Sequence, residues 1–204
     1  MRHLVFYPAV IVAFMLAIGS TSASGKWQLK KEEDGIKIFT RAMANSSLKA
    51  VRAEFTIKTT MQELAAYLMD VEKQKDWVYT TKYSNVLKRV SSTEVYYYSE
   101  KDMPGPVSNR DAVLHQKITI DPLAGTMSLA GAAVKDMVPV KKNIVRVPYA
   151  KVTWDVTPCK NGLQVIYEAE VDPGGSIPAW VVNMFITKGP YETFKKLKKN
   201  LEKT

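Results

Sequence analysis

The chain has 204 residues, of which 46% are hydrophobic and 24% charged, and its formal net charge is +9. This is the composition of a globular protein that can bury a core, so it excludes a chain that is disordered throughout. One cysteine and two histidines exclude an intramolecular disulfide and a cysteine-rich zinc site.

Residues 1–23 have the layout of a secretory signal peptide. Arg2 gives a positive start, an apolar run extends over residues 4–18, and small residues lead up to Ala23. The run is shorter than the roughly 20 residues that span a bilayer. We expect cleavage near Ala23, with an uncleaved signal anchor as the alternative. The domain at residues 24–204 is then exported, to the periplasm in a Gram-negative bacterium and otherwise out of the cell.

The positive charge bears on the choice of partner. Loss of Arg2 with the signal lowers the formal net charge to +8. For an exported protein, an anionic membrane surface is a better partner for this charge than nucleic acid, although solubility alone explains it equally well. We expect transient membrane contact, no nucleic-acid partner and a monomer.

The first part of the mature chain predicts strands and then a helix. A turn at Asp34-Gly35 separates an opening segment from a strand over residues 36–41. Residues 48–57 carry apolar side chains at every second position, which is typical of a half-buried strand. Thr60 and Glu63 form a capping-box pattern that predicts a helix. Its apolar face would contain Met61, Leu64, Ala65 and Leu68.

The middle of the chain predicts strands almost throughout. Several segments alternate between apolar and polar residues, and short turn-like loops join them, which favours antiparallel meanders. The predicted strands cover residues 86–90, 94–100, 111–120, 126–131, 144–149, 151–157 and 163–172.

The C-terminal part predicts one long helix. Ser176 is a suitable cap with Pro178 in the first turn, and an apolar stripe runs from Ile177 to Leu201. Gly189-Pro190 should kink the helix, because proline removes a backbone donor and clashes one turn back. A long curved antiparallel sheet wrapped around this helix would be an α+β fold.

Two motifs resemble those of a known family. They are MPGPVSNRD at residues 103–111 and DPGGSIPAWVVN at residues 172–183. Together with Trp27, residues 34–38, 138–142 and 147–149, and Trp154, they resemble the START (StAR-related lipid-transfer) family from residue 26 to the end of the chain.

The resemblance implies a helix-grip fold, also called START/Bet v 1-like, in which a curved antiparallel sheet and a C-terminal helix enclose a hydrophobic tunnel. It implies one bound lipid, such as a sterol, a phospholipid or a ceramide, and transfer or presentation of that lipid. Most members bind rather than catalyse. The C-terminal helix and a neighbouring loop would form a lid, for which Gly189 and Pro190 are the predicted hinge.

A lipid chain needs near-complete enclosure. About 16 methylenes at roughly 0.8 kcal/mol each represent roughly 13 kcal/mol of apolar transfer, which a shallow groove cannot recover. Candidates for the tunnel wall share the apolar faces of the predicted strands and helix, where they could equally be packed core. They are Met127, Leu129, Trp154, Tyr167, Trp180, Met184 and Phe185.

Polar residues on an apolar face are the candidates for ligand specificity. Gln116 shares a strand face with Leu114, and a buried amide is costly unless it is hydrogen-bonded. Its partner would be a polar group of the lipid, or else a neighbouring strand or a buried water. Arg110 lies on the same face and would contact the ligand or pair with a carboxylate such as Glu100. Tyr97 offers a second polar group through its hydroxyl.

The sequence supports no catalytic residue, metal site or cofactor. His115 falls on the polar face of its strand, and Cys159 lies in a predicted turn with no histidine beside it. Nucleophile-elbow, P-loop, dinucleotide and calcium-loop patterns are all missing from the sequence. An aromatase/cyclase-type enzyme on the same fold, acting on a hydrophobic polyketide-like substrate, is the alternative function. A ligand-sensing module that binds a protein partner is a third.

Overall fold

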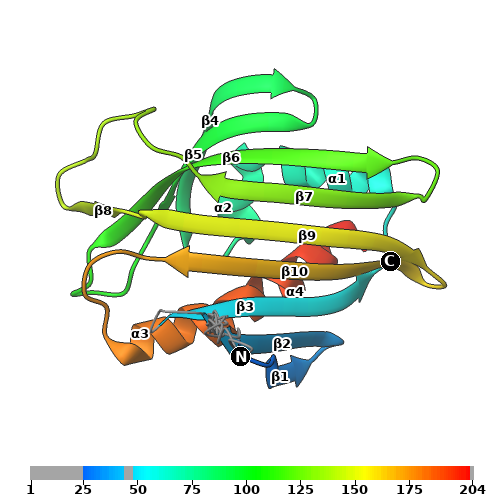
Figure 1. Cartoon of the computed structure of the whole chain (residues 1–204), viewed down its shortest axis with the longest axis horizontal. Helices are drawn as coiled ribbons and strands as arrows, with labels where there is room; N and C mark the ends of the chain where they lie inside the picture. Colours follow the sequence, from blue (N-terminus) through cyan, green and yellow to red (C-terminus); the bar gives the residue numbers. More distant parts are fainter. Residues whose placement is uncertain (1–24, 44–47, 203–204) are drawn as a thin grey trace, which may run out of the picture.

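In the part of the chain that the structure describes, ten β-strands form one curved sheet, and the C-terminal helices lie across its concave face (Figure 1). The computed structural model describes residues 25–43 and 48–202, so the predicted signal peptide lies outside the described residues. The strand order is β1-β2-β3-β10-β9-β7-β6-β5-β4, and every neighbouring pair along it is antiparallel. The predicted α+β arrangement of a curved antiparallel sheet with a C-terminal helix is confirmed.

The strands are β1 (Gln28–Glu33), β2 (Ile36–Ala42), β3 (Lys49–Ile57), β4 (Thr81–Ser91), β5 (Glu94–Lys101), β6 (Asn109–Asp121), β7 (Thr126–Ala133), β8 (Ile144–Arg146), β9 (Tyr149–Cys159) and β10 (Gly162–Asp172). The short β8 pairs with the start of β6 in parallel. The helices are α1 (Met61–Met69), the 3-10 turn η1 (Val71–Lys73), α2 (Gln74–Trp77), α3 (Ala179–Asn183), the π turn η2 (Met184–Lys188) and α4 (Gly189–Leu201).

The predicted strands are right in position but incomplete, and β1 was predicted only as an opening segment. The predicted strand at residues 86–90 is only the second half of β4. The predicted strand at residues 144–149 is divided, because Pro148 separates β8 from β9 and a proline has no N–H for the ladder. The short η1 and α2 were not predicted, since neither has a side-chain cap or enough turns to show a helical period.

The predicted capping box at the start of α1 is confirmed. The Thr60 hydroxyl accepts a hydrogen bond from the Glu63 backbone N–H, and the Glu63 carboxylate accepts one from the Thr60 backbone N–H, both at 3.2 Å. These bonds satisfy N–H groups that the first helical turn leaves without partners. On the predicted apolar face, Leu64 and Leu68 are buried, whereas Met61 and Ala65 are half-buried.

The start of the C-terminal helix corrects the prediction. The helix begins at Ala179 with Pro178 as its N-cap, so Ser176 does not cap it. The predicted disturbance at Gly189-Pro190 takes the form of the π turn η2, which directly precedes Gly189. Pro190 lies in the first turn of α4 and donates no backbone hydrogen bond, so the regular α-helical ladder is interrupted here.

The helix is joined to the sheet by a cluster of aromatic rings. Phe194 of α4 is 1% exposed, and its ring centroid lies 4.8 Å from that of Phe55 on β3. The rings of Tyr167 on β10 and Trp154 on β9 lie 5.0 and 5.6 Å from Phe194.

Among the described residues, no helix is long and apolar enough to cross a membrane.

Candidate functional site

A cavity of about 360 Å³ lies between the concave face of the sheet and the C-terminal helix. Its volume falls in the range of roughly 300–1,000 Å³ that ligand pockets occupy. Side chains of β3, β5, β6, β7, β9 and β10 line it from the sheet, and α2, α3, η2 and α4 contribute from the other side. Most of the lining side chains are apolar. We call the concave face the inner face and the opposite one the outer face.

Most of the side chains that the sequence selected border this cavity. They are Tyr97, Arg110, Leu114, Gln116, Leu129, Trp154, Tyr167 and Phe185, together with Gly189 and Pro190 of the predicted hinge. Contact with a ligand, and movement at the hinge, stay predictions for all of them.

Three selected side chains do not border the cavity. Met127 is 2% exposed and belongs to the packed core beside Val156. Trp180 is 53% exposed, because successive residues of a helix differ in direction by about 100° and its neighbour Val181 takes the inward position. Met184 is half-buried, and its neighbour Phe185 faces the cavity instead.

Sequence reasoning missed several lining residues. Lys101 follows from the alternation that already placed Tyr97 inward, since it lies four residues further along β5. Phe194 belongs to the predicted apolar stripe of the helix, but nothing in the sequence showed that it meets the cavity. Trp77 lies on α2, whose four residues give no periodic signal.

Gln116 is held by the protein itself. It is 6% exposed, and its Nε2 donates a hydrogen bond of 2.9 Å to the Leu68 carbonyl at the end of α1. Its Nε2 also lies 3.6 Å from the Met69 sulfur. These contacts favour the structural role for the amide nitrogen. The oxygen Oε1 has no hydrogen-bond partner among the described residues, which leaves an acceptor at the cavity wall.

Two tyrosine side chains place hydroxyl groups in the apolar part of the wall. Burial raises the pKa of Tyr97 to about 12, and a side-chain hydrogen bond with Gln74 opposes that rise. Burial also raises the pKa of Tyr167, with a smaller contribution from Tyr97. Both therefore stay protonated at neutral pH and can donate a hydrogen bond, but neither can serve as a base.

Arg110 is bound by backbone carbonyls rather than by an acid. It is 5% exposed, and its guanidinium donates hydrogen bonds to the carbonyls of Ser108, Pro173 (3.4 Å) and Gly174 (3.1 Å). The predicted pairing with Glu100 is wrong, because Glu100 lies on the outer face of β5 opposite Asp111. Burial lowers the pKa of Arg110 from its usual range.

Lys101 is the register partner of Arg110 across β5 and β6. Its Nζ donates hydrogen bonds to the Tyr79 carbonyl (3.2 Å) and to the Thr81 hydroxyl (2.9 Å). Burial lowers the pKa of Lys101 to about 8. We call Lys101 and Arg110 the inner pair; both border the cavity, and neither forms an ion pair with a carboxylate of the described residues.

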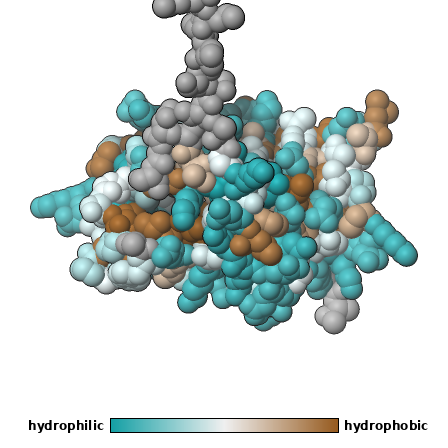
Figure 2. Space-filling model, turned by 60° about the horizontal axis from the view of Figure 1, so that its bottom comes forward, coloured by the Kyte–Doolittle hydropathy of each residue, from teal (hydrophilic) through white to brown (hydrophobic). Residues whose placement is uncertain are grey.

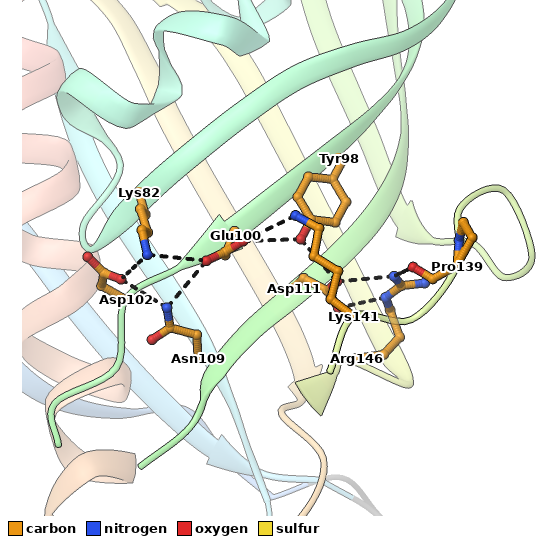
Figure 3. Close-up of polar contacts among 9 residues, drawn as sticks. All are labelled: Lys82, Tyr98, Glu100, Asp102, Asn109, Asp111, Pro139, Lys141 and Arg146. Atoms are coloured by element: carbon orange, nitrogen blue, oxygen red, sulfur yellow. Dashed lines mark hydrogen bonds and ion pairs between the residues drawn. The ribbon is translucent and has the colours of Figure 1, made fainter. Parts of the chain in front are cut away.

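Two buried carboxylates stand opposite each other on the outer face of the same two strands (Figure 3). Glu100 and Asp111 are register partners and are 7% and 1% exposed. The Tyr98 hydroxyl lies 3.3 Å from Glu100 Oε2 and 3.1 Å from Asp111 Oδ2, so it is placed to donate to either carboxylate.

Basic side chains neutralise these carboxylates. Arg146 donates two hydrogen bonds to Asp111, at 2.6 and 3.1 Å, and this raises the pKa of Arg146. The Nζ atoms of Lys141 and Lys82 lie 3.4 and 3.6 Å from Glu100. We call the whole group the outer network, which holds equal numbers of acidic and basic side chains: Lys82, Tyr98, Glu100, Asp102, Asn109, Asp111, Lys141 and Arg146.

His115 and Cys159 lie away from the cavity. His115 is half-buried on the outer face, stacked on Tyr96 at 4.3 Å between ring centroids and 2.9 Å from Glu94. Cys159 is an exposed free thiol at the end of β9 rather than in the predicted turn. In the part of the chain that the structure describes, no cluster of three histidine, cysteine or acidic side chains is arranged to hold a metal ion.

Apolar side chains reach the surface near one end of the cavity. Figure 2 shows them gathered on the left of that view, on the side where Figure 1 places α3, with hydrophilic side chains around them. The outward-facing Trp180 of α3 is one of the large exposed apolar residues of the molecule.

Comparison with known proteins agrees with this architecture. The model of the START domain matches residues 16–204. A solved structure of a STAR-related lipid transfer protein fragment from Xanthomonas axonopodis is 34% identical, with a TM-score of 0.79, and the match covers 87% of this chain and 99% of that one.

Curated sequences are also similar over most of their length. An uncharacterized protein of Pseudomonas aeruginosa is 32% identical over 196 residues, which covers 95% of this chain and 96% of that protein. Phosphatidylcholine transfer protein of Bos taurus is 26% identical over 168 residues, covering 80% and 78% of the two chains. Because the family model and the first of these relatives both span nearly the whole chain, the chain belongs to the START domain family.

Proposed function

We propose that the protein binds one lipid in its inner cavity and transfers that lipid between membranes or presents it to a partner. The observation that carries this proposal is the cavity of about 360 Å³, walled mostly by apolar side chains and closed on one side by the C-terminal helix. Relatives named for lipid transfer support it. Each methylene moved from water into such a wall contributes about 0.8 kcal/mol.

Filling the cavity tests the proposal. Purified protein, stripped of lipid, is incubated with vesicles of dioleoylphosphatidylcholine and analysed by native mass spectrometry. We expect a one-to-one lipid adduct. Ala112→Phe places a ring in the cavity from β6, and we expect it to abolish most of the adduct. Ala132→Phe adds the same ring at an exposed position on the neighbouring strand β7 and should leave the adduct unchanged.

The outcome is decided by the difference between the two variants. Equal adducts in both variants would mean that lipid binds elsewhere on the protein. Circular dichroism and urea unfolding of both variants ensure that loss of the adduct reflects a filled cavity rather than an unfolded chain.

We infer further that the cavity binds its ligand without converting it. Two features of the wall support this: Tyr97 and Tyr167 stay protonated at neutral pH, and no histidine or cysteine is among the described lining residues. A ligand recovered after prolonged incubation should have an unchanged mass. A product of altered mass, absent with Ala112→Phe, would instead indicate an enzyme.

We propose further that the protein is exported and that it contacts membranes transiently. The apolar surface near α3 and the net positive charge favour docking on an anionic bilayer. Trp180→Ala should reduce co-flotation with phosphatidylglycerol vesicles, whereas Trp27→Ala, on the N-terminal side of β1, should not. Exported protein that begins near residue 24, and elutes as a monomer, is the expected form in the cell.

A further inference from the structure

The inner pair is electrostatically unusual within this fold. Lys101 and Arg110 face each other directly across β5 and β6, and like charges in this position destabilise a sheet. Arg110 is buried and Lys101 is half-buried at the cavity wall, where a charge without a counter-ion is costly. Their described contacts are carbonyl groups and one hydroxyl, which orient the two cations without neutralising them.

The acidic pair on the outer face does not compensate the inner pair. Asp111 also borders the cavity, but Arg146 already pairs with its carboxylate. Glu100 lies on the outer face, where Lys82 and Lys141 pair with it. The lowered pKa of Lys101, for which burial is the cause, agrees with a cation that lacks a counter-charge. An anion is therefore what this part of the cavity lacks.

The donor geometry fits an oxyanion. A guanidinium has five N–H groups and an ammonium has three, and the described contacts of Arg110 and Lys101 use only some of them. The remaining N–H groups belong to two cations held in place by backbone carbonyls. Fixed donors of this kind suit carboxylate and phosphate oxygens.

The rest of the cavity suits the chain of an amphiphile. Arg110 and Gln116 lie six positions apart on β6, which corresponds to roughly 20 Å of extended strand. Between them, Ala112 and Leu114 present apolar side chains to the cavity. The wall therefore offers two cations at one end, an apolar stretch along β6, and a neutral amide oxygen at the other end.

We propose that Lys101 and Arg110 bind the anionic headgroup of the ligand, a carboxylate or a phosphate, while its apolar chain lies along β6 toward Gln116. This rests on the proposed function, since it assigns the class and the orientation of the lipid in the same cavity.

The test compares acidic and neutral lipids that share the same chains. Lipid-free protein is incubated with phosphatidylcholine vesicles that contain equal amounts of oleate and oleyl alcohol, and native mass spectrometry gives the ratio of the two adducts. A second set of vesicles contains equal amounts of dioleoylphosphatidylglycerol and dioleoylglycerol. A preference in the first set identifies a carboxylate, and one in the second set a phosphate. We expect the acidic lipid to exceed the neutral one by about tenfold in at least one set.

Two lysine variants locate the effect. Lys101→Met keeps most of the unbranched side chain and removes its charge, and it should lower the acidic-to-neutral ratio by about tenfold while uptake of the neutral lipid persists. Lys160→Met removes the same charge at an exposed turn position and should leave the ratio unchanged. Persistent neutral uptake also shows that the Lys101 variant is folded.

The failures are distinguishable. A ratio near one in both sets, or an unchanged ratio with Lys101→Met, overturns the headgroup assignment while lipid binding itself stands. Absence of every adduct, including phosphatidylcholine, overturns the proposed function and the headgroup assignment with it.

Discussion

Two neighbouring residue pairs of β5 and β6 each carry like charges. The acidic pair lies on the outer face and the basic pair on the inner face, and the two pairs differ in what surrounds them. Glu100 and Asp111 on the outer face are enclosed by lysine, arginine, tyrosine and asparagine side chains, so their charges are cancelled within the protein. Among the described residues, Lys101 and Arg110 on the inner face have only neutral oxygen acceptors. A charged group that stabilises a fold is satisfied locally, whereas one left uncompensated at a cavity is available to a ligand.

Breaking the outer network should have the largest effect on stability. Asp111→Asn removes the negative charge that Arg146 contacts with two hydrogen bonds, and it leaves a partly buried guanidinium without a counter-ion. We expect the free energy of unfolding to fall by about 3–5 kcal/mol. Urea unfolding measures this, with the exposed Asp102→Asn as a control that should cost less than about 1 kcal/mol. If both variants lost the same free energy of unfolding, the contact between Asp111 on β6 and Arg146 on β8 would not stabilise the fold.

The charge of Lys101 in the inner pair should make the stability of the protein depend on pH. Burial lowers the pKa of Lys101 from 10.5 to about 8. Between these values the unfolded chain keeps a proton that the folded protein has released, so stability contributed by this site rises with pH across that window and is lowest below it. As the pH rises from about 8 to 10.5, the free energy of unfolding of wild type should therefore increase relative to that of Lys101→Met by up to about 3 kcal/mol. The tyrosines ionise in both proteins, so their effect on stability cancels in the difference. If the free energies of unfolding of wild type and Lys101→Met changed with pH in parallel, the prediction would be contradicted.

Substitution of Gln116 should have a smaller effect on stability. Measured in lipid-free protein, it separates the structural role of the amide from any contact with a ligand. Gln116→Leu leaves the Leu68 carbonyl at the end of α1 without its donor, and we expect a loss of about 1–2 kcal/mol in urea unfolding of the lipid-free protein. Gln164→Leu, at a half-buried outer position on β10, removes the acceptor of the Thr56 hydroxyl and should cost less, about 0.5–1 kcal/mol. A lipid-free Gln116→Leu protein as stable as wild type would mean that the amide has no structural role.

The smallest change is expected at the exposed rim of the outer network. Lys82 lies 3.6 Å from both Glu100 and Asp102, and its side chain is 53% exposed. Lys82→Met should therefore lower the free energy of unfolding by less than about 1 kcal/mol, and the difference should shrink further in high salt. A loss as large as that of Asp111→Asn would show that the network depends on its exposed cations as well.

Strand alternation and turn chemistry allowed the sheet to be predicted, because a period of two is a local property of the sequence. The same alternation correctly separates the side chain of Arg110, which bonds to Pro173 and Gly174, from that of Asp111, which bonds to Arg146. What holds Arg110 could not be predicted, since the carbonyls of Pro173 and Gly174 come from a loop more than 60 residues away in the chain.

The helix was harder to predict than the sheet. Its apolar stripe is visible in the sequence, but the start at Ala179 and the π turn at residues 184–188 change which residues face inward. Trp180 was predicted to line the cavity and is exposed instead, because its neighbour Val181 takes the inward position. Lys101 was overlooked for a different reason: a lysine at the end of a strand is usually solvated, whereas here the Tyr79 carbonyl and the Thr81 hydroxyl bind its ammonium group.

The order of the strands has a consequence for how the molecule stays separate from its copies. A sheet that curves around a cavity without closing on itself ends in two strands, β1 and β4, each with one row of backbone groups unpaired in the sheet. Such a row can recruit a strand from another chain. Both edges carry exposed charged side chains, Lys30 and Glu32 on β1 and Lys88 and Arg89 on β4. These charges must be desolvated before another strand can add, so they oppose edge-to-edge aggregation.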